Sequence, residues 1–205
     1  MKHLPLSLIC NNYDLIGHID LNTLGANSGN DCWGWTDPAN GKEYALMGLN
    51  TGTSFIDISD LEFPKIVGFL PTHTNSSSWR DIKTYGNYAF IVSEASNHGM
   101  QVFDLTRLTS VGSDVPPVTF TEDAHYNGFG KAHNIVINET QGYAYAVGTN
   151  TYSGGPHFVN ISNPLNPVSE GGYGNDAYSH DAQVVTYNGP DTDYTGKEIL
   201  IGSNE

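Results

Sequence analysis

Hydrophobic and polar residues alternate along most of the chain in short runs that turn-forming residues separate. Typical runs are residues 44–49 (YALMGL), 88–92 (YAFIV) and 143–147 (YAYAV). Alternation with a period of two, in runs rich in aromatic and β-branched residues, predicts β-strands. Helical spacing is missing except at residues 104–112 (DLTRLTSVG). We therefore expect an all-β protein with one short helix.

The strand pattern repeats along the chain. Each unit has a first strand with polar residues at its head, a turn, a second strand, a third strand such as residues 55–59 (FIDIS), and a fourth strand after a proline-containing turn. The turn glycines recur about every 45 to 56 residues: Gly41, Gly86, Gly142 and Gly196. Four antiparallel strands in each repeat are typical of a β-propeller blade.

This repeat of strands divides the chain into an N-terminal segment, residues 1–29, and blades at about 30–75, 76–125, 126–175 and 176–205, of which the last is incomplete. Residues 14–21 (DLIGHIDL) look like an outer strand that completes another blade. Because propellers close with about four to eight blades, we expect a partial ring of about three to four. A four-stranded sandwich is the alternative, but it leaves the repeat unexplained.

Charge and composition narrow the range of partners. The chain carries 22 acidic and 8 basic residues, a formal net charge of −14. Such a surface repels phosphate backbones, so no nucleic-acid partner is expected. No hydrophobic run approaches the roughly 20 residues of a membrane span. Cys10 and Cys32 are compatible with one disulfide or with two free thiols.

Polar pairs stand at the head of the first strand in three units. The pairs are Arg80–Asp81, His133–Asn134 and His180–Asp181. In the first unit, residues 33–35 (WGW) hold the equivalent place. First strands lie nearest the axis of a propeller, so these side chains are expected to converge at the mouth of its channel. Imidazole and carboxylate groups together bind divalent metals.

These pairs predict a metal site that holds a divalent ion, Ca²⁺, Zn²⁺ or Mn²⁺. The predicted ligands are His133, His180, Asp81 and Asp181. The predicted supporting residues, which would hold the ligands by hydrogen bonds, are Arg80, Asn134, Glu94 and Glu205. The insertion at 121–133 offers Asp123 and His125 as further candidates. In the alternative interpretation, all these residues only bond backbone groups and fix one blade to the next.

Long segments of the chain resemble the choice-of-anchor B family, LVIVD-repeat-type proteins of bacterial and some eukaryotic surfaces. The segments are 31–59, 77–105, 132–148 and 179–199. The resemblance covers nearly all of the chain, from about Cys10 to Glu205. It implies a β-propeller, secretion or attachment to a cell surface, and members about twice this length. It does not imply a reaction, because the family's activity is undefined.

Two functions are compatible with these features. The first is an extracellular or cell-surface binding module whose ligand is a protein or a glycan. The tryptophans at 33, 35 and 79 offer sugar-stacking surfaces if they are exposed, although packing between blades also explains them. The alternative is a metal-dependent hydrolase or lyase, in which a metal at the channel lowers the pKa of bound water.

Overall fold

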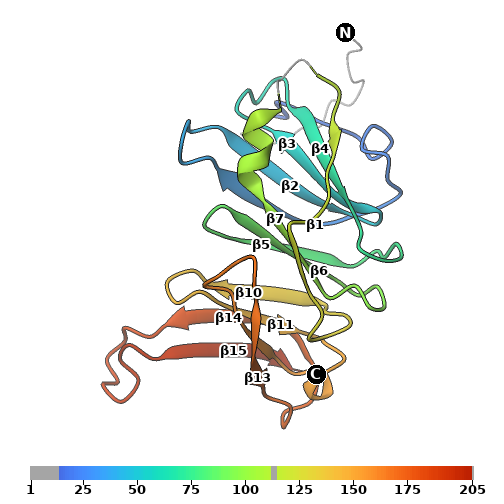
Figure 1. The fold of residues 1–205 in the computed structure, drawn as a ribbon. Helices are drawn as coiled ribbons and strands as arrows, with labels where there is room; N and C mark the ends of the chain where they lie inside the picture. Colours follow the sequence, from blue (N-terminus) through green and yellow to red (C-terminus); the bar gives the residue numbers. More distant parts are fainter. Residues whose placement is uncertain (1–13, 112–114, 205) are drawn as a thin grey trace.

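The computed structural model describes residues 14–111 and 115–204, and the structural statements below refer to these residues. Four β-sheets and two short 3₁₀-helices, η1 (Leu105–Ser110) and η2 (Tyr152–Gly154), make up the described chain (Figure 1). The predicted all-β class is confirmed. The predicted helix at 104–112 is a 3₁₀-helix, which the Asp104 side chain begins by accepting a hydrogen bond from the N–H of Thr106.

The strands of each sheet are consecutive in the chain, except that β8 (Val118–Thr119), which follows β7 (Met100–Asp104) in the chain, lies in sheet 1. Sheet 1 holds β1 (Gly29–Thr36), β2 (Glu43–Leu49), β3 (Gly52–Asp57), β4 (Lys65–Pro71) and β8. Sheet 2 holds β5 (Arg80–Tyr85), β6 (Tyr88–Ser93), β7 and β9 (Ala124–Tyr126). All pairs are antiparallel except β8, which lies parallel to β4.

The other two sheets come from the C-terminal half. Sheet 3 holds β10 (Asn134–Asn138), β11 (Tyr143–Val147), β12 (His157–Asn160) and β13 (Val168–Gly172). Sheet 4 holds β14 (Ser179–Thr186) and β15 (Glu198–Asn204). The periodic glycines lie in the turns between first and second strands, and all have positive φ, as with 55° at Gly86. Only glycine adopts this conformation without strain, which explains the repeat of glycine in the sequence.

The first strands of the four sheets, β1, β5, β10 and β14, lie next to one another in chain order (Figure 1). Sheet 2 is buried on both faces: Ile91 of β6 packs toward sheet 1 with Phe55, and Phe90 packs toward sheet 3 with Ile135. Because both faces are covered, β6 reads as a continuous hydrophobic run. Each such buried side chain stabilises the fold by about 1.5–3 kcal/mol.

Carboxylates join the first strands of neighbouring sheets. Asp31 of β1 accepts a hydrogen bond from the backbone N–H of Ile82 in β5 at 3.0 Å. Asp81 of β5 accepts one from the backbone N–H of Ile135 in β10 at 2.7 Å. The bond to Asp81 satisfies the buried N–H of Ile135, whereas the N–H of Ile82 is shared between Asp31 and Asp81. The same connection therefore appears at two successive joints.

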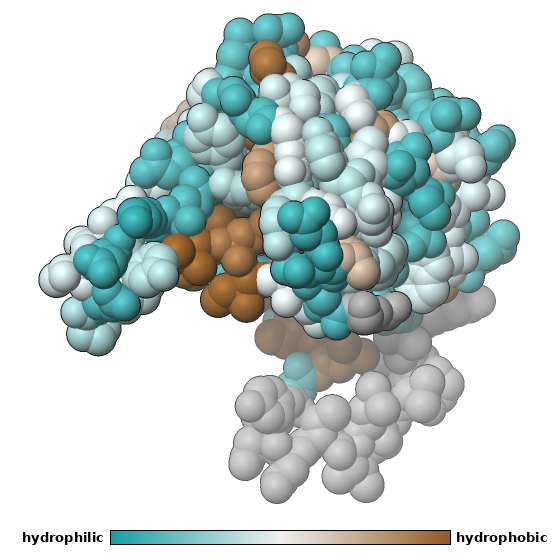
Figure 2. All heavy atoms as spheres, turned by 90° about the horizontal axis from the view of Figure 1, so that it is seen from below, coloured by the Kyte–Doolittle hydropathy of each residue, from teal (hydrophilic) through white to brown (hydrophobic). Residues whose placement is uncertain are grey.

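The outer faces of the terminal sheets differ. Residues 14–28, where a strand was predicted at 14–21, form no strand and instead lie along sheet 1, where a pocket of about 460 Å³ separates Ile16 and Leu24 from Met47. Asn50 holds this segment by accepting backbone hydrogen bonds from residues 27 and 28. On sheet 4, Val185 and Ile201 are exposed, and Figure 2 shows hydrophobic surface beside the projecting β14–β15 hairpin. No helix in the described part of the chain is long and apolar enough to cross a membrane.

Candidate functional site

Two histidines and a glutamate from three sheets meet beside the first strands. His133 stands directly before β10, His180 lies in β14, and Glu94 directly follows β6. His133 Nδ1 lies 2.6 Å from Glu94 Oε1, and His133 Nε2 lies 3.1 Å from His180 Nε2. With Trp79 we call these residues the histidine face. Three of the predicted site residues are therefore brought together.

Hydrogen bonding fixes the tautomer of His133. A carboxylate only accepts hydrogen bonds, so His133 donates its Nδ1–H to Glu94. A neutral ring then carries a lone pair on Nε2, which is the atom that faces His180. A carboxylate on the far nitrogen of a histidine is the arrangement that orients metal-ligating histidines. Glu94 therefore contacts a predicted ligand in the way expected of a supporting residue, and the metal site itself remains a prediction.

An exposed tryptophan borders the histidine face. The Trp79 ring lies 5.7 Å from the His133 ring, and Trp79 is 49% exposed. Its carbonyl oxygen accepts hydrogen bonds from the hydroxyl of Ser93 (2.9 Å) and from the N–H of Glu94 (3.3 Å). Both donors are at the end of β6. The backbone of Trp79 is therefore anchored while its ring remains open to solvent.

Asp81, one of the two aspartates predicted as metal ligands, does not fit that role. Asp81 is 4% exposed and accepts hydrogen bonds from Lys83, from its neighbour Ile82 and from Ile135 across the joint. Burial, together with the nearby carboxylate of Asp31, raises the pKa of Asp81 to about 7. Both its carboxylate oxygens already accept hydrogen bonds within the fold.

Asp181 and the predicted supporting residues are placed differently again. Asp181 is exposed, and its Oδ1 accepts a hydrogen bond from the N–H of Ala182 at 2.7 Å. Asn134 is the first residue of β10 and pairs with Val147 through its backbone. Glu205 lies outside the described residues, as does Cys10, so the disulfide alternatives remain predictions. Cys32 is an exposed thiol on β1.

Arg80 is fully buried and points between sheets 1 and 2, not toward the histidine face. Its guanidinium donates to the carbonyl of Leu49 (3.0 Å) and the hydroxyl of Thr72 (2.8 Å), and its Nη1 lies 3.1 Å from His98 Nε2. Burial lowers its pKa to about 10. Side chains alternate along a strand, so neighbouring polar residues at a strand head face different surroundings. The prediction that Arg80 supports a metal ligand was wrong.

The first unit also differs from its prediction. Asn30 and Asp31, rather than residues 33–35, stand opposite the head of β5, where Asn30 accepts the N–H of Arg80 at 2.9 Å. An irregular register between Gly29 and Cys32, with Asp31 at a φ of 59°, shifts the strand so that these side chains reach the joint. The alternation pattern alone gives no signal for such a bulge.

The described residues contain a second group of histidine and carboxylate side chains, which sequence reasoning did not assemble. His73, Glu122 and His125 each place one ligand atom within 4.8 Å of the others. His73 follows β4, whereas Glu122 and His125 flank the start of β9, 49 and 52 residues later. His125 was a candidate by itself, but no spacing in the sequence connects it to His73.

The donor set of the histidine face suits zinc better than calcium or manganese. Imidazole nitrogens favour zinc, whereas Ca²⁺ takes oxygen ligands. A tetrahedral zinc ion with Zn–N bonds of about 2.0–2.1 Å holds two nitrogens roughly 3.3 Å apart, close to the 3.1 Å between His133 Nε2 and His180 Nε2.

No protein-family model matches the sequence, and a search of curated proteins also returns no match.

Proposed function

We propose that the chain is part of an extracellular β-propeller of the choice-of-anchor B type and acts as a binding module for neutral glycans through the histidine face. The side-by-side order of β1, β5, β10 and β14 supports the propeller, because first strands line the axis in that fold. Two carboxylate connections between successive first strands support a repeated radial joint.

The observation that carries the proposed function is an exposed tryptophan next to interacting polar side chains from three sheets. A sugar ring has a flat apolar face and a rim of hydroxyl groups. Trp79 supplies a stacking surface for the apolar face. Glu94 supplies acceptor oxygens, and the imidazoles of His133 and His180 supply donors or acceptors for the hydroxyls.

The negative charge of the chain favours neutral glycans over anionic ones. The net charge of −14 disfavours sialylated, sulfated or uronic acid-containing chains. A neutral oligosaccharide meets no such repulsion. Neutral glycans are therefore the ligand class that the surface accepts most readily.

A zinc ion at His133 and His180 is a second part of this proposal. The two histidines would be its protein ligands, with Glu94 orienting His133. Catalytic zinc sites usually have three protein ligands, and Asp81, which the enzyme alternative needed as a further ligand, is sequestered in a joint. Asp81 is therefore not available as a third ligand, which supports binding over hydrolysis or lyase chemistry.

The test is a titration with a panel of neutral oligosaccharides, monitored by tryptophan fluorescence and calorimetry, with and without zinc. We expect a member of the panel to bind, Trp79→Ala to remove binding, and the control Trp33→Ala, on β1 outside the histidine face, to retain it. Equal binding by the Trp79→Ala variant, or selective binding of protein ligands only, would contradict the proposal. If zinc leaves both affinity and melting temperature unchanged, the metal part alone is wrong.

A further inference from the structure

His73 and His125 lie face to face at the boundary of sheets 1 and 2, away from the histidine face. Their ring centroids are 3.7 Å apart, and the ring planes differ by 11°. Glu122 Oε1 lies 2.7 Å from His73 Nδ1, and its Oε2 accepts a hydrogen bond from the Gln101 amide at 2.6 Å. These side chains come from two separate connections and from β7 and β9.

Each of the two rings uses one nitrogen as a donor. His73 faces a carboxylate with Nδ1, so Nδ1 carries the proton. His125 Nε2 lies 2.7 Å from the carbonyl oxygen of His98, so Nε2 carries the proton there. The remaining nitrogens, His73 Nε2 and His125 Nδ1, hold lone pairs when the rings are neutral. A bond from the far nitrogen to a carboxylate or carbonyl is typical of histidines that ligate metals.

A surface pocket lies beside His73, next to the His125 ring that stacks on it. This pocket of about 230 Å³ is lined by His73, Gln101 and Glu122 together with residues 70–72 and 120–121. Gln101 is 2% exposed, and its side-chain oxygen has no hydrogen-bond partner among the described residues. A buried acceptor of this kind is satisfied by a water or by a hydrated ion.

We propose that His73 and His125 bind one divalent transition-metal ion, with zinc as the representative, through His73 Nε2 and His125 Nδ1, while Glu122 orients His73 through its Nδ1–H. Imidazole nitrogens are preferred zinc ligands, and water can complete the coordination. The acidic surface raises the local concentration of cations. In stacked rings the in-plane lone pairs run parallel and do not point at one atom. Both nitrogens therefore reach one ion only after His73 rotates, and the His73 side chain, 33% exposed, has room to do so.

The site is tested in a background from which the histidine face has been removed. Zinc is titrated by calorimetry into the full chain carrying His133→Ala and His180→Ala. We expect one zinc ion to bind per chain. Adding His73→Ala or His125→Ala weakens binding at least tenfold, and adding Glu122→Gln weakens it less. The control His18→Ala, an exposed histidine near the N-terminus, leaves the affinity unchanged.

A spectroscopic measurement checks the same proposal without relying on variants that must fold. Long-range ¹H–¹⁵N spectra of the histidine rings should show Nδ1–H for His73 and Nε2–H for His125. Zinc should then shift the signals of His73 Nε2 and His125 Nδ1 more than those of the protonated nitrogens in the same two rings, His73 Nδ1 and His125 Nε2. Absence of zinc binding in the His133→Ala/His180→Ala background, or unchanged affinity when His73 and His125 are both replaced, overturns the proposal. Neither result bears on glycan binding at Trp79.

Discussion

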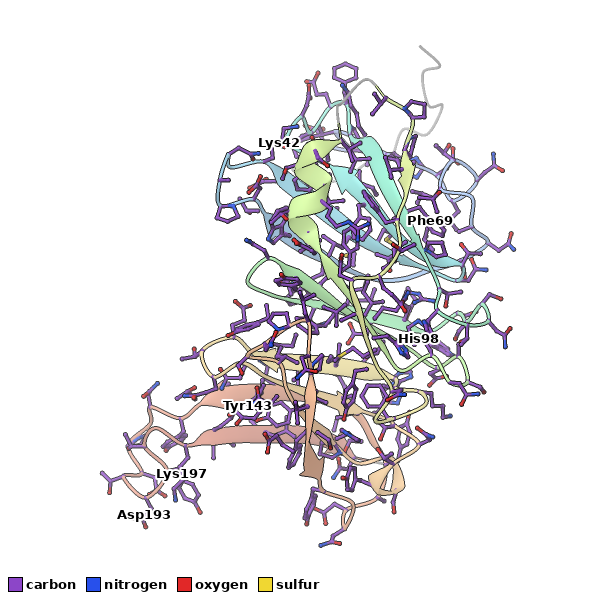
Figure 3. All side chains as sticks on the ribbon, viewed as in Figure 1. Lys42, Phe69, His98, Tyr143, Asp193 and Lys197 are labelled. Carbon is purple, nitrogen blue, oxygen red and sulfur yellow. The ribbon has the colours of Figure 1, made fainter. Side chains whose placement is uncertain are left out.

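Lowering the pH from 7 to 5 is expected to destabilise the fold through His98, which is fully buried between sheets 1 and 2. Figure 3 labels this residue, which lies in the connection between β6 and β7. A guanidinium only donates, so His98 Nε2 must accept from Arg80 Nη1 and cannot carry a proton. His98 Nδ1 faces the carbonyl oxygen of Gly99 at 3.0 Å. Burial and the Arg80 charge lower its pKa from 6.5 to about 4.

The sign and size of the effect follow from linkage. The unfolded chain binds a proton at His98 below pH 6.5, whereas the folded chain resists it until about pH 4. The stability that comes from this histidine is therefore complete above pH 6.5 and is lost as the pH falls toward 4. The shift is worth about 3–4 kcal/mol in total at about 1.4 kcal/mol per pKa unit. Roughly 2 kcal/mol of this is lost between pH 7 and pH 5.

The assay compares urea unfolding at pH 7, 6 and 5 for the wild type, His98→Gln and the control His18→Gln. Glutamine stays neutral and can accept from Arg80, so His98→Gln should lose about 2 kcal/mol less than the wild type over this range. Buried His157, whose pKa burial also lowers, keeps its own contribution in all three proteins. Parallel pH profiles for the wild type and His98→Gln would refute the reasoning.

Three further substitutions test the packing and the joints by thermal and urea unfolding. Gly68→Ala places a methyl group against the ring of Phe120 and should cost about 1–3 kcal/mol, whereas Gly34→Ala, with no atom within 4 Å of the new carbon, should be nearly neutral; equal effects would contradict the packing. Asp81→Ala leaves buried donors without an acceptor and should cost about 3–5 kcal/mol, so a loss below 1 kcal/mol would exclude its role in the joint. Phe55→Ala should cost about 3–5 kcal/mol, because its side chain is fully buried in the core; a small loss would mean that the core collapses around the cavity.

The sequence predicted the strands well because their signal is local. A hydrophobic run such as residues 88–92 reflects the burial of that strand, and each recurring turn glycine reflects a positive φ at its position. The all-β class follows from them directly. The wheel-like arrangement of the four sheets remains a prediction, because it depends on how sheets pack and not on any single strand.

The candidate site was predicted only in part. His133 and His180 repeat the first position of the strand-head pairs in successive units, and Glu94, at the end of a second strand, lies beside them. Asp81 holds the second position of its pair, and its carboxylate is a structural acceptor. The pairing of His73 with His125 arises where a loop of sheet 1 crosses an edge of sheet 2, and periodicity does not encode such a crossing.

The connections made by Asp31 and Asp81 have a consequence for how such a chain evolves. The acceptor side chain belongs to one unit, and the backbone N–H that it binds is present in the next unit at any residue except proline. A duplicated unit therefore carries its own acceptor side chain, and its neighbour needs no matching mutation to bind it. A chain built in this way can gain or lose whole units, and the same hydrogen bond can form between the units that become neighbours.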